Sequence, residues 1–148
     1  MAIETATQAS PAARAAPACK GSENTTEGIR VWVQPAFLAH NSDAAARQFV
    51  FTYCIRITNE SGRTVRLLTR AWHIVDAVGR INEVVGEGVI GQQPILKPGQ
   101  SFEYSSLCNL ATPWGTMEGT YGFAADADER FEARIKRFYL VAGDTKSA

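Results

Sequence analysis

Hydrophobic and polar residues alternate along most of the chain from Gly28 onward. In residues 49–57, FVFTYCIRI, a large apolar side chain occupies every second position. Sustained alternation with a period of two is typical of a strand that buries one face. The segment 65–76 shows the same pattern, but its phase slips at Leu67-Leu68, which predicts a β-bulge. Comparable alternation predicts further strands at residues 29–34, 101–107, 116–125 and 130–141.

Short turn signals separate these strands, and no amphipathic segment has the length of a helix. The turns are expected at NESGRT (59–64), AVGR (77–80) and DADE (126–129). Many short strands with frequent turns are typical of a sandwich. The pattern therefore predicts an all-β fold: a single antiparallel β-sandwich of about seven strands, like a fibronectin type III or immunoglobulin domain.

The alternation does not extend into residues 1–27, which are rich in Ala, Thr and Ser and carry two prolines. A segment with so few large apolar side chains buries too little surface to offset the entropy lost on ordering. We expect a disordered tail over 1–27, the sandwich domain over 28–141, and a short C-terminal tail over 142–148.

Composition and charge exclude several classes of function. The 148 residues are 45% hydrophobic, enough for one ordinary core, and 15 basic residues balance 15 acidic ones. A net charge of zero lacks the basic surface of a protein that binds nucleic acid or membranes. No apolar segment is long enough to span a bilayer, and Glu4 stands where a signal peptide carries positive charge. The expected location is the cytoplasm.

The residues whose side chains could act in catalysis or bind a metal do not match any known catalytic or metal-binding motif. His40 and His73 are far apart, and no Cys or His spacing fits a zinc site. The acidic residues Asp76, Glu83 and Glu87 match no known metal-binding loop. We therefore expect no catalytic residues, metal or cofactor, and a protein that is not an enzyme.

One motif suggests a nucleotide: GEGVIGQQP (86–94) has Gly86, Gly88 and Gly91 in the G-x-G-x-x-G order of dinucleotide-binding loops. That motif needs a helix directly after it, and Pro94 and Pro98 prevent one here. We expect no binding of NAD or FAD. A structural loop remains one interpretation. The other is a small-anion site for pyrophosphate or a dinucleoside polyphosphate, with Arg80 as the nearby cation.

Three long segments in order, LLTRAWHIVDAVGR (67–80), VVGEGVIGQQPILKPGQSFEYSS (84–106) and TPWGTMEGTYGF (112–123), resemble the ApaG family. The resemblance covers residues 28–141. It implies a fibronectin type III-like sandwich, a link to cobalt and magnesium tolerance, and a gene position beside a diadenosine tetraphosphate hydrolase. Related domains in eukaryotic F-box proteins and in a DNA-polymerase-interacting protein imply protein binding. The family has no established catalytic residues, and this chain departs from it at Ala71, where many members carry histidine.

The apolar residues of two expected loops, 86–94 and 109–115, suggest where a partner binds. Val89, Ile90 and Trp114 are expected on one partner-binding surface at one end of the sandwich, together with Leu110. An alternative is that Trp114 folds inward and caps the core. The sequence thus predicts a non-enzymatic protein-binding module whose partner is another protein or a second copy of the chain.

Overall fold

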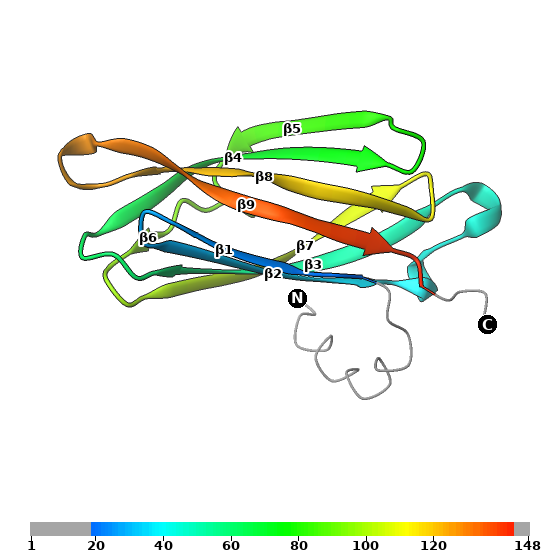
Figure 1. Cartoon of the computed structure of the whole chain (residues 1–148), viewed down its shortest axis with the longest axis horizontal. Helices are drawn as coiled ribbons and strands as arrows, with labels where there is room; N and C mark the ends of the chain where they lie inside the picture. Colours follow the sequence, from blue (N-terminus) through cyan, green and yellow to red (C-terminus); the bar gives the residue numbers. More distant parts are fainter. Residues whose placement is uncertain (1–18, 144–148) are drawn as a thin grey trace.

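The structure, a computed structural model that describes residues 19–143, is a sandwich of two antiparallel sheets (Figure 1). One sheet has the order β1-β2-β3-β7, with β1 Ser22–Thr26, β2 Ile29–Phe37, β3 Phe49–Asn59 and β7 Ser101–Leu110. The other has the order β5-β4-β8-β9, with β5 Ile81–Glu87, β4 Val65–Asp76, β8 Trp114–Ala124 and β9 Arg130–Val141. Strand β6, Ile95–Leu96, also pairs with β4. Short 3-10 turns occupy Ala39–Asn41, Ala44–Ala46 and Asp126–Asp128. The predicted all-β sandwich is confirmed.

The core lies between the sheets and follows the predicted alternation. On β3, Phe51, Ile55 and Ile57 are completely buried and Tyr53 is 5% exposed, while Thr52, Cys54 and Arg56 lie on the outer face. The bulge predicted at Leu67-Leu68 is present, because the register of β4 against β8 shifts between Leu67 and Thr69.

The expectation of a disordered tail over 1–27 is wrong for its last part. Strand β1 pairs along its whole length with β2, and Lys20 forms a bridge with Tyr139 of β9. The hydroxyl of Ser22 donates to the carbonyl of Lys136 at 2.6 Å. This strand is held by hydrogen bonds and buries none of its side chains, so it leaves no apolar pattern in the sequence. Residues 1–18 and 144–148 lie outside the described residues.

Removing β1 should therefore cost stability. We expect a chain that begins at Gly28 to unfold with a free energy lower by about 2 kcal/mol or more than a chain that begins at Cys19. The loss exceeds the ~0.5 kcal/mol typical of a surface change, because a full strand ladder disappears. Urea denaturation of the two chains measures it. Equal midpoints would show that β1 contributes nothing to the fold.

Two further strands, β5 and β6, were not predicted. Strand β5 enters the expected 86–94 loop and is exposed along almost its entire length. Trp114, expected in a loop, begins β8 instead.

Among residues 19–143, no helix is long and apolar enough to cross a membrane.

Candidate functional site

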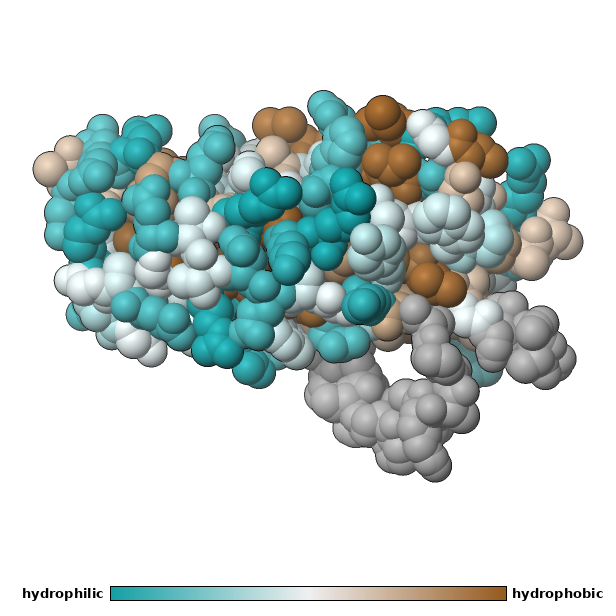
Figure 2. All heavy atoms as spheres, in the orientation of Figure 1, coloured by the Kyte–Doolittle hydropathy of each residue, from teal (hydrophilic) through white to brown (hydrophobic). Residues whose placement is uncertain are grey.

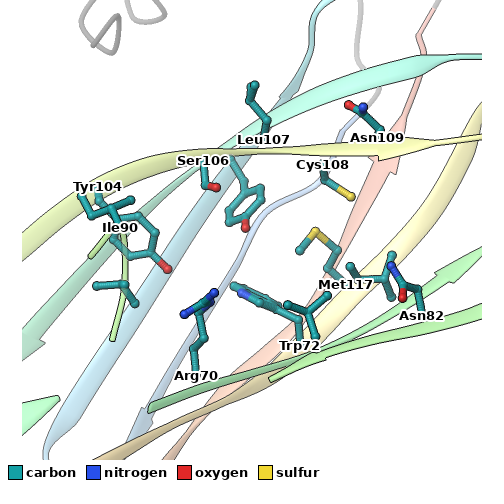
Figure 3. A pocket seen from close by; sticks show the side chains of 14 residues that line it. Arg70, Trp72, Asn82, Ile90, Tyr104, Ser106, Leu107, Cys108, Asn109 and Met117 are labelled. Atoms are coloured by element: carbon teal, nitrogen blue, oxygen red, sulfur yellow. The ribbon is translucent and has the colours of Figure 1, made fainter. Parts of the chain in front are cut away.

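The two sides of the sandwich differ. On one side β1 and β9 lie together, joined by the bridge between Lys20 and Tyr139. On the other side, the edge strands β5 and β7 have no further strand beside them within the described chain. Residues of β5 and β7 there line a hollow of about 390 Å³ (Figure 3). A second hollow of about 310 Å³ shares Ile74, Asn82 and Asn109 with it and leads to the turn at 77–80. We call the two hollows together the edge groove.

Arg70 is the one charged side chain among the described residues that line the larger hollow. It comes from the inner face of β4, opposite Gly86 of β5. A side chain at Gly86 would need the space of the guanidinium, since a Cβ there would lie 2.9 Å from Nη1 of Arg70. That same nitrogen donates to the carbonyls of Glu87, at 3.1 Å, and Gly88, at 2.9 Å. Arg70 therefore holds the loop that follows β5.

Three tyrosines lie close to this guanidinium. The hydroxyls of Tyr104 and Tyr121 are hydrogen-bonded to each other at 2.5 Å. Burial raises the pKa of both phenols well above the usual range, so both keep their protons. Burial also raises the pKa of Tyr53, which lines the same hollow. Figure 3 shows the hydroxyl of Tyr104 and the guanidinium of Arg70 pointing toward one another in the hollow.

Exposed apolar side chains border the edge groove. Figure 2 shows hydrophobic atoms gathered on the upper edge of the molecule, where β5 runs in Figure 1. The apolar residues of the described chain that are more than half exposed are Val85 (75%), Val78 (71%), Leu107 (62%), Ile81 (58%), Ile95 (56%) and Ile90 (53%). Of these, Ile81, Ile90 and Leu107 line the groove. A monomeric domain rarely leaves such residues together at its surface unless something covers them.

The glycine loop is built as a turn. Gly88 and Gly91 have φ of 67° and 77°, a left-handed conformation that favours glycine. Three of the loop amides are used within the chain: Gly88 donates to the carbonyl of Leu68, and Val89 and Gln92 donate to each other's carbonyl, all at 2.8 Å. A phosphate site of this kind needs several free amides pointing at the anion. The contacts that are present fit the structural interpretation of this loop.

Arg80 does not lie beside this loop. The β4–β5 hairpin pairs Val75 with Ile81 and Arg70 with Gly86, so Arg80 is at the opposite end of β5. Its amide donates to the side chain of Asp76 at 2.9 Å, within the turn. The expectation that Arg80 supplies the cation near Gly86 is wrong, and Arg70 occupies that place.

The predicted surface of Val89, Ile90 and Trp114 is only partly correct. Val89 and Leu110 are 1% and 6% exposed, so both are buried in the core, where Val89 lines the larger hollow and Leu110 the second one. Ile90 and Trp114 are exposed, but they lie near opposite ends of β4. Gly115, next to Trp114, pairs with Asp76, whereas the glycine loop follows the pairing of Glu87 with Thr69. The structure therefore does not bring them together.

The acidic residues considered for a metal also lie apart. Asp76 accepts two turn amides, Glu83 contacts His73 on the outer face at 2.8 Å, and Glu87 stands at the far end of β5. Within residues 19–143, no group of three or more His, Cys, Asp or Glu side chains is placed to hold a metal ion. The three cysteines are free thiols, and burial raises the pKa of Cys108, which lines the hollow, to about 11.

The fold and groove define a small β-sandwich domain with one closed and one open edge. The profile of the ApaG domain matches residues 39–125. A protein called ApaG from Rhodospirillum centenum is 50% identical over 115 residues, covering 78% of this chain and 88% of that protein. The ApaG protein of Rhizobium meliloti is 48% identical with the same coverage. The chain belongs to the ApaG domain family.

A solved structure supports the assignment in three dimensions. The crystal structure of the putative ApaA protein from Bordetella pertussis superimposes with a TM-score of 0.75 at 40% sequence identity. It covers 84% of this chain and 97% of that protein.

Proposed function

We propose that this ApaG domain is a non-enzymatic protein-binding module of the cytoplasm whose recognition surface is the edge groove. The observation that carries the proposal is the set of exposed apolar side chains along β5 and β7, the two edge strands beside which residues 19–143 place no further strand. The protein-binding role inferred for related domains points the same way.

Strand β5 has the properties of a strand that accepts another one. Natural sheet edges are usually protected by lysine, proline or a covering segment. The sequence of β5, INEVVGE, has no lysine or proline; its charged residues are Glu83 and Glu87, and it presents Val84 toward the groove and Val85 toward the outer face. A partner segment that pairs with β5 would satisfy the unpaired backbone groups and cover both valines.

The lip of the groove carries a strained residue. Ile90 has φ of 41°, a left-handed conformation that a β-branched side chain adopts at an energetic cost. The strain holds a half-exposed isoleucine at the mouth of the larger hollow. Strained, exposed residues of this kind cluster at binding sites.

Site-specific photo-crosslinking tests the proposal. A photoreactive amino acid at Val85 or Leu107 should crosslink one protein partner in living cells, and the same group at Tyr139 on the closed edge should not. Val85→Lys should weaken that capture at least about tenfold, because it adds a charge on the unpaired edge, while stability changes by less than ~0.5 kcal/mol. Tyr139→Lys is the matched control.

The mass of the crosslinked product also identifies the kind of partner. A product of twice the chain mass would show that the second strand comes from another copy of this protein. Equal crosslinking from Val85 and Tyr139, or capture unchanged by Val85→Lys, would contradict the assignment of the groove.

A further inference from the structure

The larger hollow contains hydrogen-bond donors that have no acceptor. Arg70 uses only Nη1, and its Nε and Nη2 have no partner among residues 19–143. No carboxylate of the described chain forms an ion pair with it. A guanidinium that is partly buried without a counter-ion is unusual, because burial of a charge is costly unless it is paired.

The tyrosine pair adds another unused donor. One hydroxyl proton joins Tyr104 to Tyr121, so one of the two hydroxyls has a proton left over. Neither hydroxyl has a further partner among the described residues. Tyr121 is 0% exposed and does not line the hollow, whereas Tyr104 does. With Tyr121 as the donor within the pair, the proton of Tyr104 points into the hollow beside Arg70.

The surroundings of these donors select the type of anion. The lining supplies one positive charge, which matches a carboxylate and leaves a phosphate dianion half neutralised. The other lining groups near Arg70 include Trp72, Val84 and Met117, whose apolar surfaces suit the carbon chain that carries a carboxylate. The two amides Asn82 and Asn109 stand at the passage to the second hollow.

We propose that the Arg70 hollow binds a carboxylate group, with Nη2 or Nε of Arg70 and the hydroxyl of Tyr104 as its donors. The proposal deepens the protein-binding function: the segment that lies along β5 places an Asp or Glu side chain, or its C-terminal carboxylate, in this hollow. Arg70 then has two roles, since Nη1 holds the glycine loop and the rest of the guanidinium binds the partner.

An NMR titration of the full-length, ¹⁵N-labelled protein tests the site without any protein partner. Butyrate is the probe, butyramide its uncharged analogue, and inorganic phosphate and pyrophosphate the competing anions, all at one ionic strength. Butyrate should shift the amides around the hollow, among them Gly86, Val89 and Ser106, with a dissociation constant of about 1–10 mM. Butyramide and both phosphates should bind at least about tenfold more weakly.

Variants assign the donors. Arg70→Met should weaken butyrate binding at least about tenfold, and Tyr104→Phe about three- to tenfold. Tyr121→Phe is the matched control: it removes the other hydroxyl of the same pair and should leave affinity within about twofold, because Tyr104 keeps its proton. The amide spectrum of each variant verifies that it is folded. If Arg70→Met does not fold, the comparison of Tyr104→Phe with Tyr121→Phe still tests whether a carboxylate binds in the hollow.

Several results would overturn the proposal. They are equal binding of butyramide, tighter binding of phosphate or pyrophosphate, no shift at about 50 mM butyrate, or equal affinity of the Tyr104→Phe and Tyr121→Phe proteins. If a partner crosslinks to β5 but butyrate does not bind, the carboxylate proposal is rejected and the protein-binding function is kept. If butyrate binds but no partner crosslinks, the protein-binding function is rejected and the carboxylate site is kept.

Discussion

Replacing Trp72 with alanine should lower the free energy of unfolding by about 3–5 kcal/mol, the range for removal of a large core aromatic side chain. Trp72 is 5% exposed and packs edge-on against three rings, with 5.4 Å to Tyr53, 5.9 Å to Phe138 and 6.3 Å to Tyr121 between centroids. These rings come from both sheets, so the indole fills space that neither sheet can close alone. Urea denaturation followed by circular dichroism measures the loss.

Trp114→Ala is the matched control within the same chain. Trp114 is 47% exposed, and the hydrogen bond from Thr112 reaches its backbone carbonyl, which alanine retains. We expect a change within about 1 kcal/mol. A loss as large as that of Trp72→Ala would show that Trp114 caps the core.

Gly119→Ala should lower the free energy of unfolding by at least about 3 kcal/mol, since overpacking against backbone cannot be relieved by rotation of a side chain. Gly119 lies at the bulge of β8, opposite Trp72. A Cβ at this position would lie 1.9 Å from the carbonyl oxygen of Ala71 and 3.0 Å from its carbonyl carbon. The two central strands would have to separate to admit one methyl group.

The control for this substitution is Gly62→Ala in the turn after β3. No atom lies within 4 Å of a Cβ at that position, and its φ is not in the left-handed region. A change of less than about 0.5 kcal/mol is expected. Similar thermal unfolding midpoints for the two alanine variants would contradict the steric argument.

The strands that could be predicted from the sequence are those with one buried and one exposed face. Strand β3 is the clearest case, because alternate positions from Phe51 to Ile57 are buried. Strands β1 and β5 break that rule in opposite ways. The polar β1 is held by backbone and hydroxyl groups, whereas β5 has valines on both faces and little burial on either. Hydrophobicity alternates along a strand when one of its faces is buried and the other is exposed. Neither β1 nor β5 has such a buried face, so neither shows the pattern.

The candidate site was harder to predict for a related reason. The pattern of β4 places Arg70 on the inner face, but alternation alone does not show that the sheets leave a hollow there. The decisive signal is the register of the β4–β5 hairpin, which puts Gly86 opposite Arg70. Recognition of β5 as a strand, joined to β4 through the turn at 77–80, would have given that register. The glycine motif instead points to the backbone amides of the loop, three of which already donate to carbonyls of this chain.

The closed edge of the sandwich has a consequence for how the domain is built into larger proteins. Cys19 and Val141, near the two ends of the described chain, touch each other, with 3.4 Å between the sulfur of one and the amide nitrogen of the other. The described part of the chain therefore begins and ends at adjacent points, on the side away from the edge groove. A host protein can carry such a unit as an insertion in a single surface loop, because the two points of attachment lie side by side. The same geometry keeps the groove directed outward from the host, so recognition and attachment use opposite edges of one fold.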